Sequence, residues 1–295
     1  MAQRNFFQNK VALITGGSRG LGLQIARELC AHGAKVSLLA RNVDELASAK
    51  NHLQPFNSEV LTVECDLTET ASIQSAVQQT LQRFGQIDIL INNAGIIEVG
   101  PLDHLQFKDF DRNLRLHFWA PYILFLLVTP QMRAKGGGRI VNISSIGGRI
   151  GVPHLAAYCA SKFALAGFSD AIRPELARDK IYVTTVTPGL MRTGSHVHAQ
   201  FKGDHHAEYR WFHSSLKLPL ASISVERAAR KIVRACRRGK PVLVMPFSTY
   251  LAIAANAFFP NLSARVMKLI NRVLPGRVSQ EGNTAKSGLA ITAAK

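Results

Sequence analysis

Cysteine is scarce in this chain: its 295 residues include four cysteines, which are scattered along the sequence. Their spacing fits neither a disulfide framework nor a set of metal ligands, so we expect buried thiols in a reducing compartment and no bound metal. The sequence also lacks an apolar leader, an internal repeat and any low-complexity block before about residue 275. These absences favour a cytoplasmic protein with one globular domain.

Acidic residues are also few, with 19 Asp and Glu against 36 Lys and Arg, which gives a net charge of +17. Most of this excess lies beyond residue 195. Basic proteins often bind nucleic acid, but we find no recognition motif or basic–aromatic platform and expect no such partner. The charge instead suits an anionic cofactor and substrate, or an anionic membrane surface.

Strand-like apolar runs alternate with helical stretches along most of the chain. This alternation predicts right-handed βαβ units, and therefore an α/β fold with a doubly wound parallel sheet, the Rossmann fold. We expect a single domain over residues 1–247, followed by an apolar and basic helical extension over 248–279 and a flexible tail over 280–295. The predicted strands lie at residues 10–14, 36–40, 59–65, 87–91, 139–144, 181–187 and 241–245.

A glycine-rich loop and a helix follow directly after the first predicted strand. The glycines have the spacing Gly-x-x-x-Gly-x-Gly, not the commoner Gly-x-Gly-x-x-Gly. Such a loop can be only a tight connection, but it also lets the backbone and the helix N-terminus approach a pyrophosphate. The candidate cofactor contacts in this motif are Thr15, Gly16, Ser18, Arg19, Gly20, Leu21 and Gly22.

Tyr158 and Lys162 are spaced four apart, so they lie on one face of a predicted helix, and Ser145 precedes Tyr158 by thirteen residues. A free phenol has a pKa of about 10, which makes it a poor acid or base at neutral pH. A neighbouring ammonium stabilises the phenolate and lowers that pKa. The Ser145 hydroxyl could hold a substrate oxygen beside the phenol. These residues indicate acid–base chemistry on an oxygen atom.

Two further motifs follow strands in the same order. Asn-Asn-Ala-Gly at residues 92–95 follows one strand, and Pro188-Gly189 follows another, with Thr193 four residues beyond. The combined set, over residues 8–195, resembles the short-chain dehydrogenase/reductase family. The resemblance implies a nicotinamide-dependent oxidoreductase acting on a ketone or secondary alcohol, commonly as a homodimer or homotetramer.

The resemblance also implies a role for each matching residue. Tyr158 would protonate the carbonyl oxygen during reduction, Lys162 would bind the nicotinamide ribose and lower the pKa of Tyr158, and Ser145 would bind the substrate oxygen. Asp66 would contact the adenine ring, and Thr193 the nicotinamide carboxamide. The remaining implied cofactor contacts are Leu67, Asn92, Asn93, Ala94, Gly95, Pro188 and Gly189.

One position departs from the family pattern. The family usually places an asparagine on the helix before Ser145, where it helps to hold a water of the proton relay, and this chain has His117 there, with Asn113 one turn earlier. A histidine could replace the asparagine, because it donates and accepts hydrogen bonds and titrates near neutrality. It could equally be a core histidine with satisfied hydrogen bonds. We count His117 as a candidate catalytic residue.

The end of the second strand predicts the cofactor type. An acidic residue there would accept the ribose hydroxyls of NAD, but this chain has Ala40 followed by Arg41. Arg19 in the glycine loop supplies a second guanidinium, and arginine pairs well with phosphate. With two arginines and no carboxylate at this end of the site, we predict NADP(H).

The resemblance implies that residues 190–220 form a lid over the substrate. This segment contains several aromatic residues, which favour a lipophilic substrate but could equally pack the lid onto the body. Its five histidines have no ligand-like spacing, so we expect no metal. The alternative to a carbonyl reductase is a catalytically weak scaffold or sensor that binds NADP(H).

The C-terminal extension combines apolar and basic residues. Residues 248–259 are too few to span a bilayer, and a basic amphipathic helix is predicted from about residue 262. Residues 248–274 could lie on an anionic membrane surface, so we expect the protein to be cytoplasmic or peripheral on a membrane. They could equally cap the core or form a subunit interface.

Overall fold

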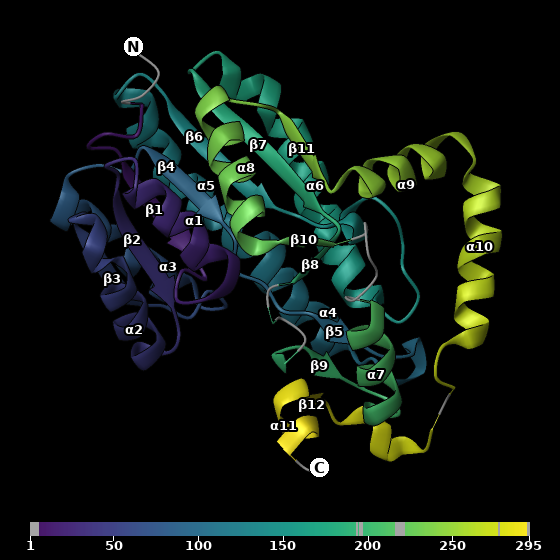
Figure 1. Ribbon diagram of the computed structural model, residues 1–295. Coiled ribbons are helices and arrows are strands. Elements are labelled where there is room, and N and C mark those ends of the chain that lie inside the picture. Colours follow the sequence, from purple (N-terminus) through teal and green to yellow (C-terminus); the bar gives the residue numbers. More distant parts are fainter. Residues whose placement is uncertain (1–5, 193, 195–196, 216–221, 277, 294–295) are drawn as a thin grey trace.

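Seven parallel strands form the centre of the computed structural model, which describes residues 6–192, 194, 197–215, 222–276 and 278–293 (Figure 1). Their order, β3-β2-β1-β4-β6-β7-β11, reverses direction beside β1, as in doubly wound folds. The predicted fold class is confirmed, and each predicted strand is present. The strands are β1 (Val11–Thr15), β2 (Lys35–Ala40), β3 (Val60–Glu64), β4 (Ile89–Asn92), β6 (Gly138–Ile143), β7 (Ile181–Pro188) and β11 (Val242–Met245).

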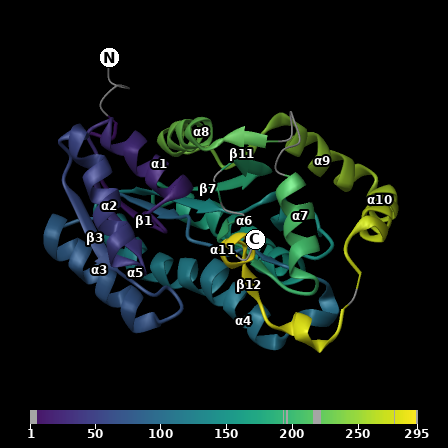
Figure 2. The ribbon, with the colours of Figure 1, turned by 60° about the horizontal axis from the view of Figure 1, so that its bottom comes forward.

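Helices cover both faces of this sheet, which is why its strands are apolar runs without alternation (Figures 1 and 2). On one face, α1 (Gly20–Cys30), α2 (Val43–Leu53) and α8 (Val225–Arg238) enclose one apolar core. On the other face, α3 (Thr70–Phe84), α5 (Ala120–Ala134) and α6 (Ala156–Ala177) enclose a second. A short helix, α4 (Phe107–Leu114), precedes α5.

Two small sheets lie beyond the carboxyl end of the main sheet. β8 (Leu190–Arg192) pairs with β10 (Ser222–Ser224), and β9 (Gln200–Phe201) pairs with β5 (Glu98–Val99) and β12 (Lys286–Ser287). The lid helix α7 (His205–Ser215) and the final helix α11 (Gly288–Ala293) pack beside them. β12 corrects the expectation of a flexible tail, because this part of the chain adds a strand to the lid.

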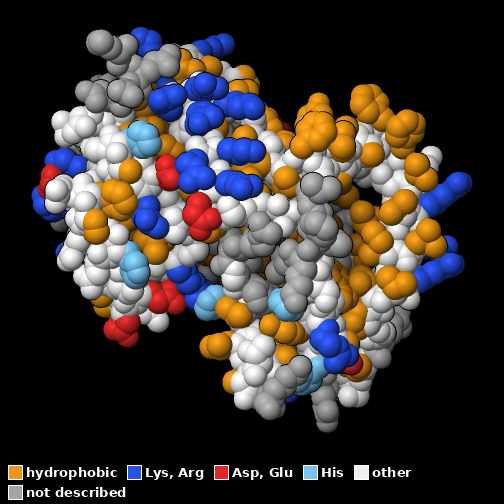
Figure 3. Space-filling view, in the orientation of Figure 1, with side chains coloured by type: hydrophobic (Ala, Val, Ile, Leu, Met, Phe, Trp, Pro, Cys, Tyr) orange, Lys and Arg blue, Asp and Glu red, His pale blue; other side chains and the backbone are white. Residues whose placement is uncertain are grey.

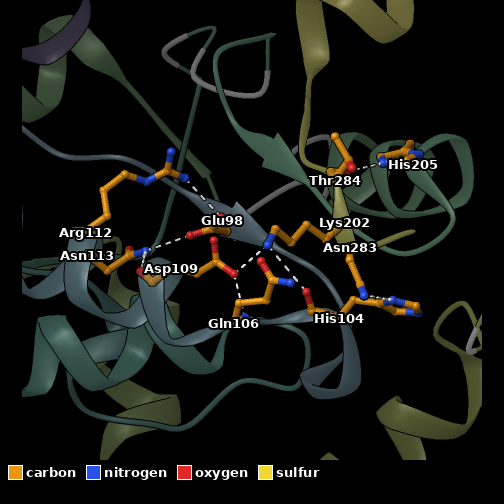
Figure 4. Close-up of polar contacts among 10 residues, drawn as sticks. All are labelled: Glu98, His104, Gln106, Asp109, Arg112, Asn113, Lys202, His205, Asn283 and Thr284. Atoms are coloured by element: carbon orange, nitrogen blue, oxygen red, sulfur yellow. Dashed lines mark hydrogen bonds and ion pairs between the residues drawn. The ribbon is translucent and has the colours of Figure 1, made fainter. Parts of the chain in front are cut away.

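A buried polar cluster lies where the tail meets the body (Figure 4). His104 accepts a hydrogen bond from the Val278 N–H through Nε2, so its Nδ1 donates to Oδ1 of Asn283, 2.8 Å away. Beside it, the buried Lys202 ammonium pairs with Asp109. Through the two hydrogen bonds of His104, the chain contacts the body again from residue 278 onwards.

Ile291 gives a test of this tail. Its side chain is 3% exposed and packs in an apolar cluster with residues of the lid. Ile291→Ala should lower the free energy of opening of residues 278–293 by about 2 kcal/mol, because it leaves a cavity. Hydrogen exchange of those amides measures the change. Leu289→Ala, at a side chain that is 60% exposed, should leave the exchange rates unchanged.

Two helices, α9 (Phe247–Phe258) and α10 (Pro260–Val273), connect β11 to the tail and stand away from the body (Figures 1 and 2). We call residues 247–273 the arm. Thr249 is the only residue of α9 that is buried, and none is buried in α10. The arm therefore does not cap the core. In the part of the chain that the structure describes, no helix has the length and apolarity to cross a membrane.

Candidate active site

The glycine loop joins β1 to α1 at the point where the strand order reverses. Gly16 and Gly20 have φ angles of 62° and 54°, which favour glycine, and a Cβ at Gly22 would overlap the carbonyl oxygen of Gly16. Arg19 occupies the N-cap of α1 without a capping side-chain hydrogen bond. The loop therefore packs tightly against the start of α1, and a pyrophosphate could approach the N-terminus of that helix.

Asn93 fixes the shape of this loop. Its Nδ2 donates to the carbonyl oxygens of Thr15 and Gly16, at 3.0 and 3.1 Å. In return, the Thr15 hydroxyl accepts hydrogen bonds from the N–H groups of Asn93 and Ala94. Asn92 instead donates to Asn142 within the core, 2.7 Å away. Of the two asparagines, Asn93 is the one bonded to the glycine loop.

The adenosine end of the site contains a carboxylate that the sequence analysis missed. Glu45 accepts hydrogen bonds from the Ser18 hydroxyl at 2.9 Å and from Arg19 at 3.1 Å. The local signal was the N-cap Asn42, which accepts from the Glu45 N–H and places this residue in the first turn of α2. The expectation that this end of the site has two arginines and no carboxylate is therefore wrong, because Glu45 pairs with Arg19. Arg41 is exposed.

Asp66 and Leu67 follow β3, at the carboxyl end of the parallel sheet where the glycine loop follows β1. Burial opposes ionisation of Asp66, but two hydrogen bonds from Thr68 and the charge of Arg41 outweigh it and lower its pKa. Leu67 is buried, with 7% of its surface exposed. Asp66 therefore places an ionised carboxylate near Arg41.

Ser145, Tyr158 and Lys162 converge where β6 ends and α6 begins. The Ser145 hydroxyl accepts a hydrogen bond from the Gly147 N–H at 3.1 Å, and it lies close enough to the Tyr158 phenol to lower the pKa of that group. Ser144 is turned away, because its hydroxyl donates to the Lys162 carbonyl oxygen. Of the two serines, Ser145 is thus the one beside the phenol, and its role in binding the substrate oxygen stays a prediction.

Burial controls the ionisation of both Tyr158 and Lys162. It raises the pKa of Tyr158 to about 12, against a smaller lowering by Ser145, and it lowers the pKa of Lys162 to about 7. The Lys162 ammonium donates to the Ile143 carbonyl oxygen at 3.0 Å and lies 5.8 Å from the Tyr158 ring centroid. This differs from the expected lowering of the Tyr158 pKa, because desolvation of the phenol is the largest influence on it.

His117 lies in a π-helical turn, Arg115–Trp119, between α4 and α5. Its Nε2 accepts from the Ile96 N–H at 3.1 Å, so its Nδ1 carries the proton and donates to the Ser161 hydroxyl at 2.7 Å. Ser161 donates in turn to the Tyr158 carbonyl oxygen. Burial, with a contribution from Lys162, lowers the pKa of His117 well below 6.5. His117 is therefore a neutral ring with both nitrogens engaged, between the residue 96 loop and the helix of Tyr158.

This arrangement also explains two neighbouring residues. A Cβ at Gly95 would lie 2.9 Å from Nε2 of His117, so the close approach of the loop requires glycine there. Asn113 does not join the Tyr158 site, because its side chain donates to Glu98 and to the Asp109 carbonyl oxygen. Asn113 thus belongs to the polar cluster under the tail.

The lid contributes apolar packing beside Tyr158. Phe201 and Phe212 are buried in a cluster with Leu155 and Cys159, and Tyr158 packs against it. At least these two aromatics therefore pack the lid onto the body. Pro188 ends β7 and Gly189 follows it, while Thr193 lies outside the described residues. Within the described part of the chain, no group of three potential metal ligands is found.

Comparison with known proteins agrees with this geometry. The pattern of the short chain dehydrogenase family matches residues 10–202. Dehydrogenase/reductase SDR family member 7B of Rattus norvegicus is 33% identical over 270 residues, which cover 89% of this chain and 81% of that protein. A fatty acyl-CoA reductase of Acinetobacter baylyi is 37% identical over 192 residues, covering 64% of this chain and 65% of that protein.

A solved structure is similar over most of the chain. L-sorbose reductase from Gluconobacter frateurii, complexed with NADPH and L-sorbose, superposes with a TM-score of 0.73 at 28% identity, covering 81% of this chain and 95% of that one. The chain belongs to the short-chain dehydrogenase family and is an oxidoreductase with a nucleotide-binding Rossmann fold.

Proposed function

We propose that the protein reduces a lipophilic ketone to a secondary alcohol, or runs the reverse reaction, with NADP(H) as its cofactor. The observation that carries this proposal is the convergence of Ser145, Tyr158 and Lys162 at one end of the sheet, beside a glycine loop that leaves room for a pyrophosphate. NADPH would supply the hydride. The remaining chemistry is assigned to side chains of this protein.

Each residue has a distinct task in this proposal. Ser145 holds the carbonyl oxygen of the substrate within reach of the phenol, and Tyr158 donates its proton to that oxygen as negative charge develops there. Lys162 hydrogen-bonds the ribose of the cofactor, and its charge favours loss of the phenolic proton. His117 is a positioning residue, because it bonds the loop and the helix that place Gly95 and Tyr158.

The lipophilic substrate is inferred from what surrounds Tyr158. Partly buried apolar side chains that pack against that cluster include Ile97, Val152 and Leu190, which would offer a substrate apolar contacts. A relative named as a fatty acyl-CoA reductase is in keeping with this class. A non-catalytic scaffold is the second candidate, favoured only by His117 at the usual asparagine position.

The first test is NADPH oxidation with purified protein and a series of ketones of increasing chain length and ring content. We expect turnover to rise with substrate apolarity. Tight binding of NADPH without reduction of any ketone would instead favour the scaffold.

Cofactor choice can be tested through Arg41 and Glu45. Arg41→Ala should weaken NADPH binding about tenfold or more and leave NADH binding little changed, because it removes a phosphate partner. Glu45→Gln should strengthen NADPH binding, since Arg19 would no longer be shared with a carboxylate. The Arg19–Glu45 pair is half exposed, so the gain should be modest. Fluorescence titration with both cofactors measures these changes, and equal losses for NADH in Arg41→Ala would contradict the assignment.

We also infer that the protein is a homodimer or homotetramer. Trp119 and Phe163, on the helices that carry the site, are 49% and 44% exposed, as an apolar subunit interface requires. Analytical ultracentrifugation tests this inference.

A further inference from the structure

The arm carries an unusual share of the exposed apolar surface. Among the described residues, nineteen large hydrophobic side chains are exposed, and ten of them lie within residues 247–273. Soluble proteins rarely expose large apolar patches without a binding partner. The ten are Phe247, Tyr250, Leu251, Phe258, Phe259, Leu262, Val266, Leu269, Ile270 and Val273.

The charge of this region has one sign. The arm contains Arg265, Lys268 and Arg272 and no acidic residue. Neighbouring α8 buries an apolar face against the body and carries six arginines and lysines against one acidic residue, Glu226. Figure 3 shows Lys and Arg side chains gathered over α8, and hydrophobic side chains over α9 and α10, on the same face of the molecule.

The choice of partner follows from these two properties. A second copy of this chain would bring another arm without acidic residues against the first, on a protein whose net charge is +17. An anionic phospholipid surface offers both an apolar interior and opposite charge. Helices of 12 and 14 residues, separated at Phe259, suit a position in the plane of that surface.

We propose that the arm docks on the surface of a bilayer rich in anionic phospholipid. The apolar side chains of α9 and α10 enter the boundary between headgroups and acyl chains, while the cations of α10 and α8 contact lipid phosphates. The base of the arm lies next to the active-site edge, because Thr249 packs directly against Gly189 at the end of β7. Docking stands on its own observations and does not depend on the reaction proposed for Tyr158.

Vesicle sedimentation with the full chain tests the proposal. We expect strong binding to vesicles of equal parts phosphatidylserine and phosphatidylcholine, weak binding to phosphatidylcholine alone, and loss of binding as salt is raised. The triple change Leu262→Ser, Val266→Ser and Leu269→Ser removes apolar side chains and should weaken binding at least about tenfold. The triple change Arg265→Gln, Lys268→Gln and Arg272→Gln should weaken it about 100-fold, from roughly a factor of five for each cation.

Phe107→Ser provides the matched control, because Phe107 is 85% exposed but lies on α4, outside the arm. This variant should bind vesicles as the wild type does. All variants should keep the wild-type circular dichroism and melting temperature, since the changed side chains are exposed or partly exposed. Unchanged vesicle binding by both arm variants would overturn the proposal. So would an absence of wild-type binding together with a loss of self-association in the serine variant, which would identify a second copy as the partner.

Discussion

Tyr158→Phe should lower the rate of ketone reduction by about a thousandfold while NADPH still binds within about twofold of the wild-type affinity. The substitution removes only the phenolic oxygen, which is the proposed proton donor. The ring keeps its edge-to-face contact with His117, whose centroid lies 5.5 Å away. Single-turnover kinetics and a fluorescence titration separate the two effects.

The control for this change is Tyr182→Phe. Tyr182 is on β7, 41% exposed, and stacks on Arg139 away from the site. Removal of the hydroxyl group from this tyrosine should leave turnover unchanged. If Tyr158→Phe kept the wild-type rate, another proton donor would be required. Tyr158 would then act only in packing.

Lys162→Met should abolish turnover and yet stabilise the folded protein at neutral and acidic pH. Lysine in the unfolded chain has its ordinary pKa of 10.5, whereas burial lowers the pKa of Lys162 to about 7 in the folded protein. The unfolded state therefore binds more protons between these two pH values, and stability rises with pH across that range. The cost of burying the ammonium is fully present below about pH 7 and disappears towards about pH 10.5.

We therefore expect Lys162→Met to raise the free energy of unfolding by on the order of 2–4 kcal/mol at about pH 6, with the gain vanishing at about pH 10. Urea denaturation at both pH values measures it. Lys50→Met, at an exposed position on α2, should show no such pH dependence. A variant that is destabilised equally at both pH values would show that the hydrogen bond to Ile143, and not desolvation, dominates at this position.

The sequence predicted the central sheet well, because its strands are apolar runs between glycine and asparagine turns. Ser145, Tyr158 and Lys162 were singled out from their spacing together with the family resemblance, and the end of β6 and one turn of α6 bring them together. Glu45 was missed because it approaches Arg19 only through the packing of α2 beside the glycine loop. For the same reason, the neutral state of His117 could not be predicted, as its two partners come from residues 96 and 161.

The tail shows a different limit of sequence analysis. β12 has two residues and no apolar pattern of its own, so nothing local distinguishes it from a loop. Its position depends on pairing with β9 and on contacts such as His104 with Asn283, which join residues far apart in the chain. Short elements that are stabilised only by distant partners cannot be predicted from local periodicity.

The return of the chain to β9 gives the arm two points of attachment, β11 at one end and β12 at the other. A segment fixed at both ends cannot swivel as a terminal tail would, so a molecule that docks through the arm has a defined orientation. Its active-site edge then stays at one height and angle above the lipid. A ketone dissolved in the bilayer would therefore approach that edge from one direction only. The two attachments also mean that a protease cut within α10 would leave both pieces bound to the same folded body.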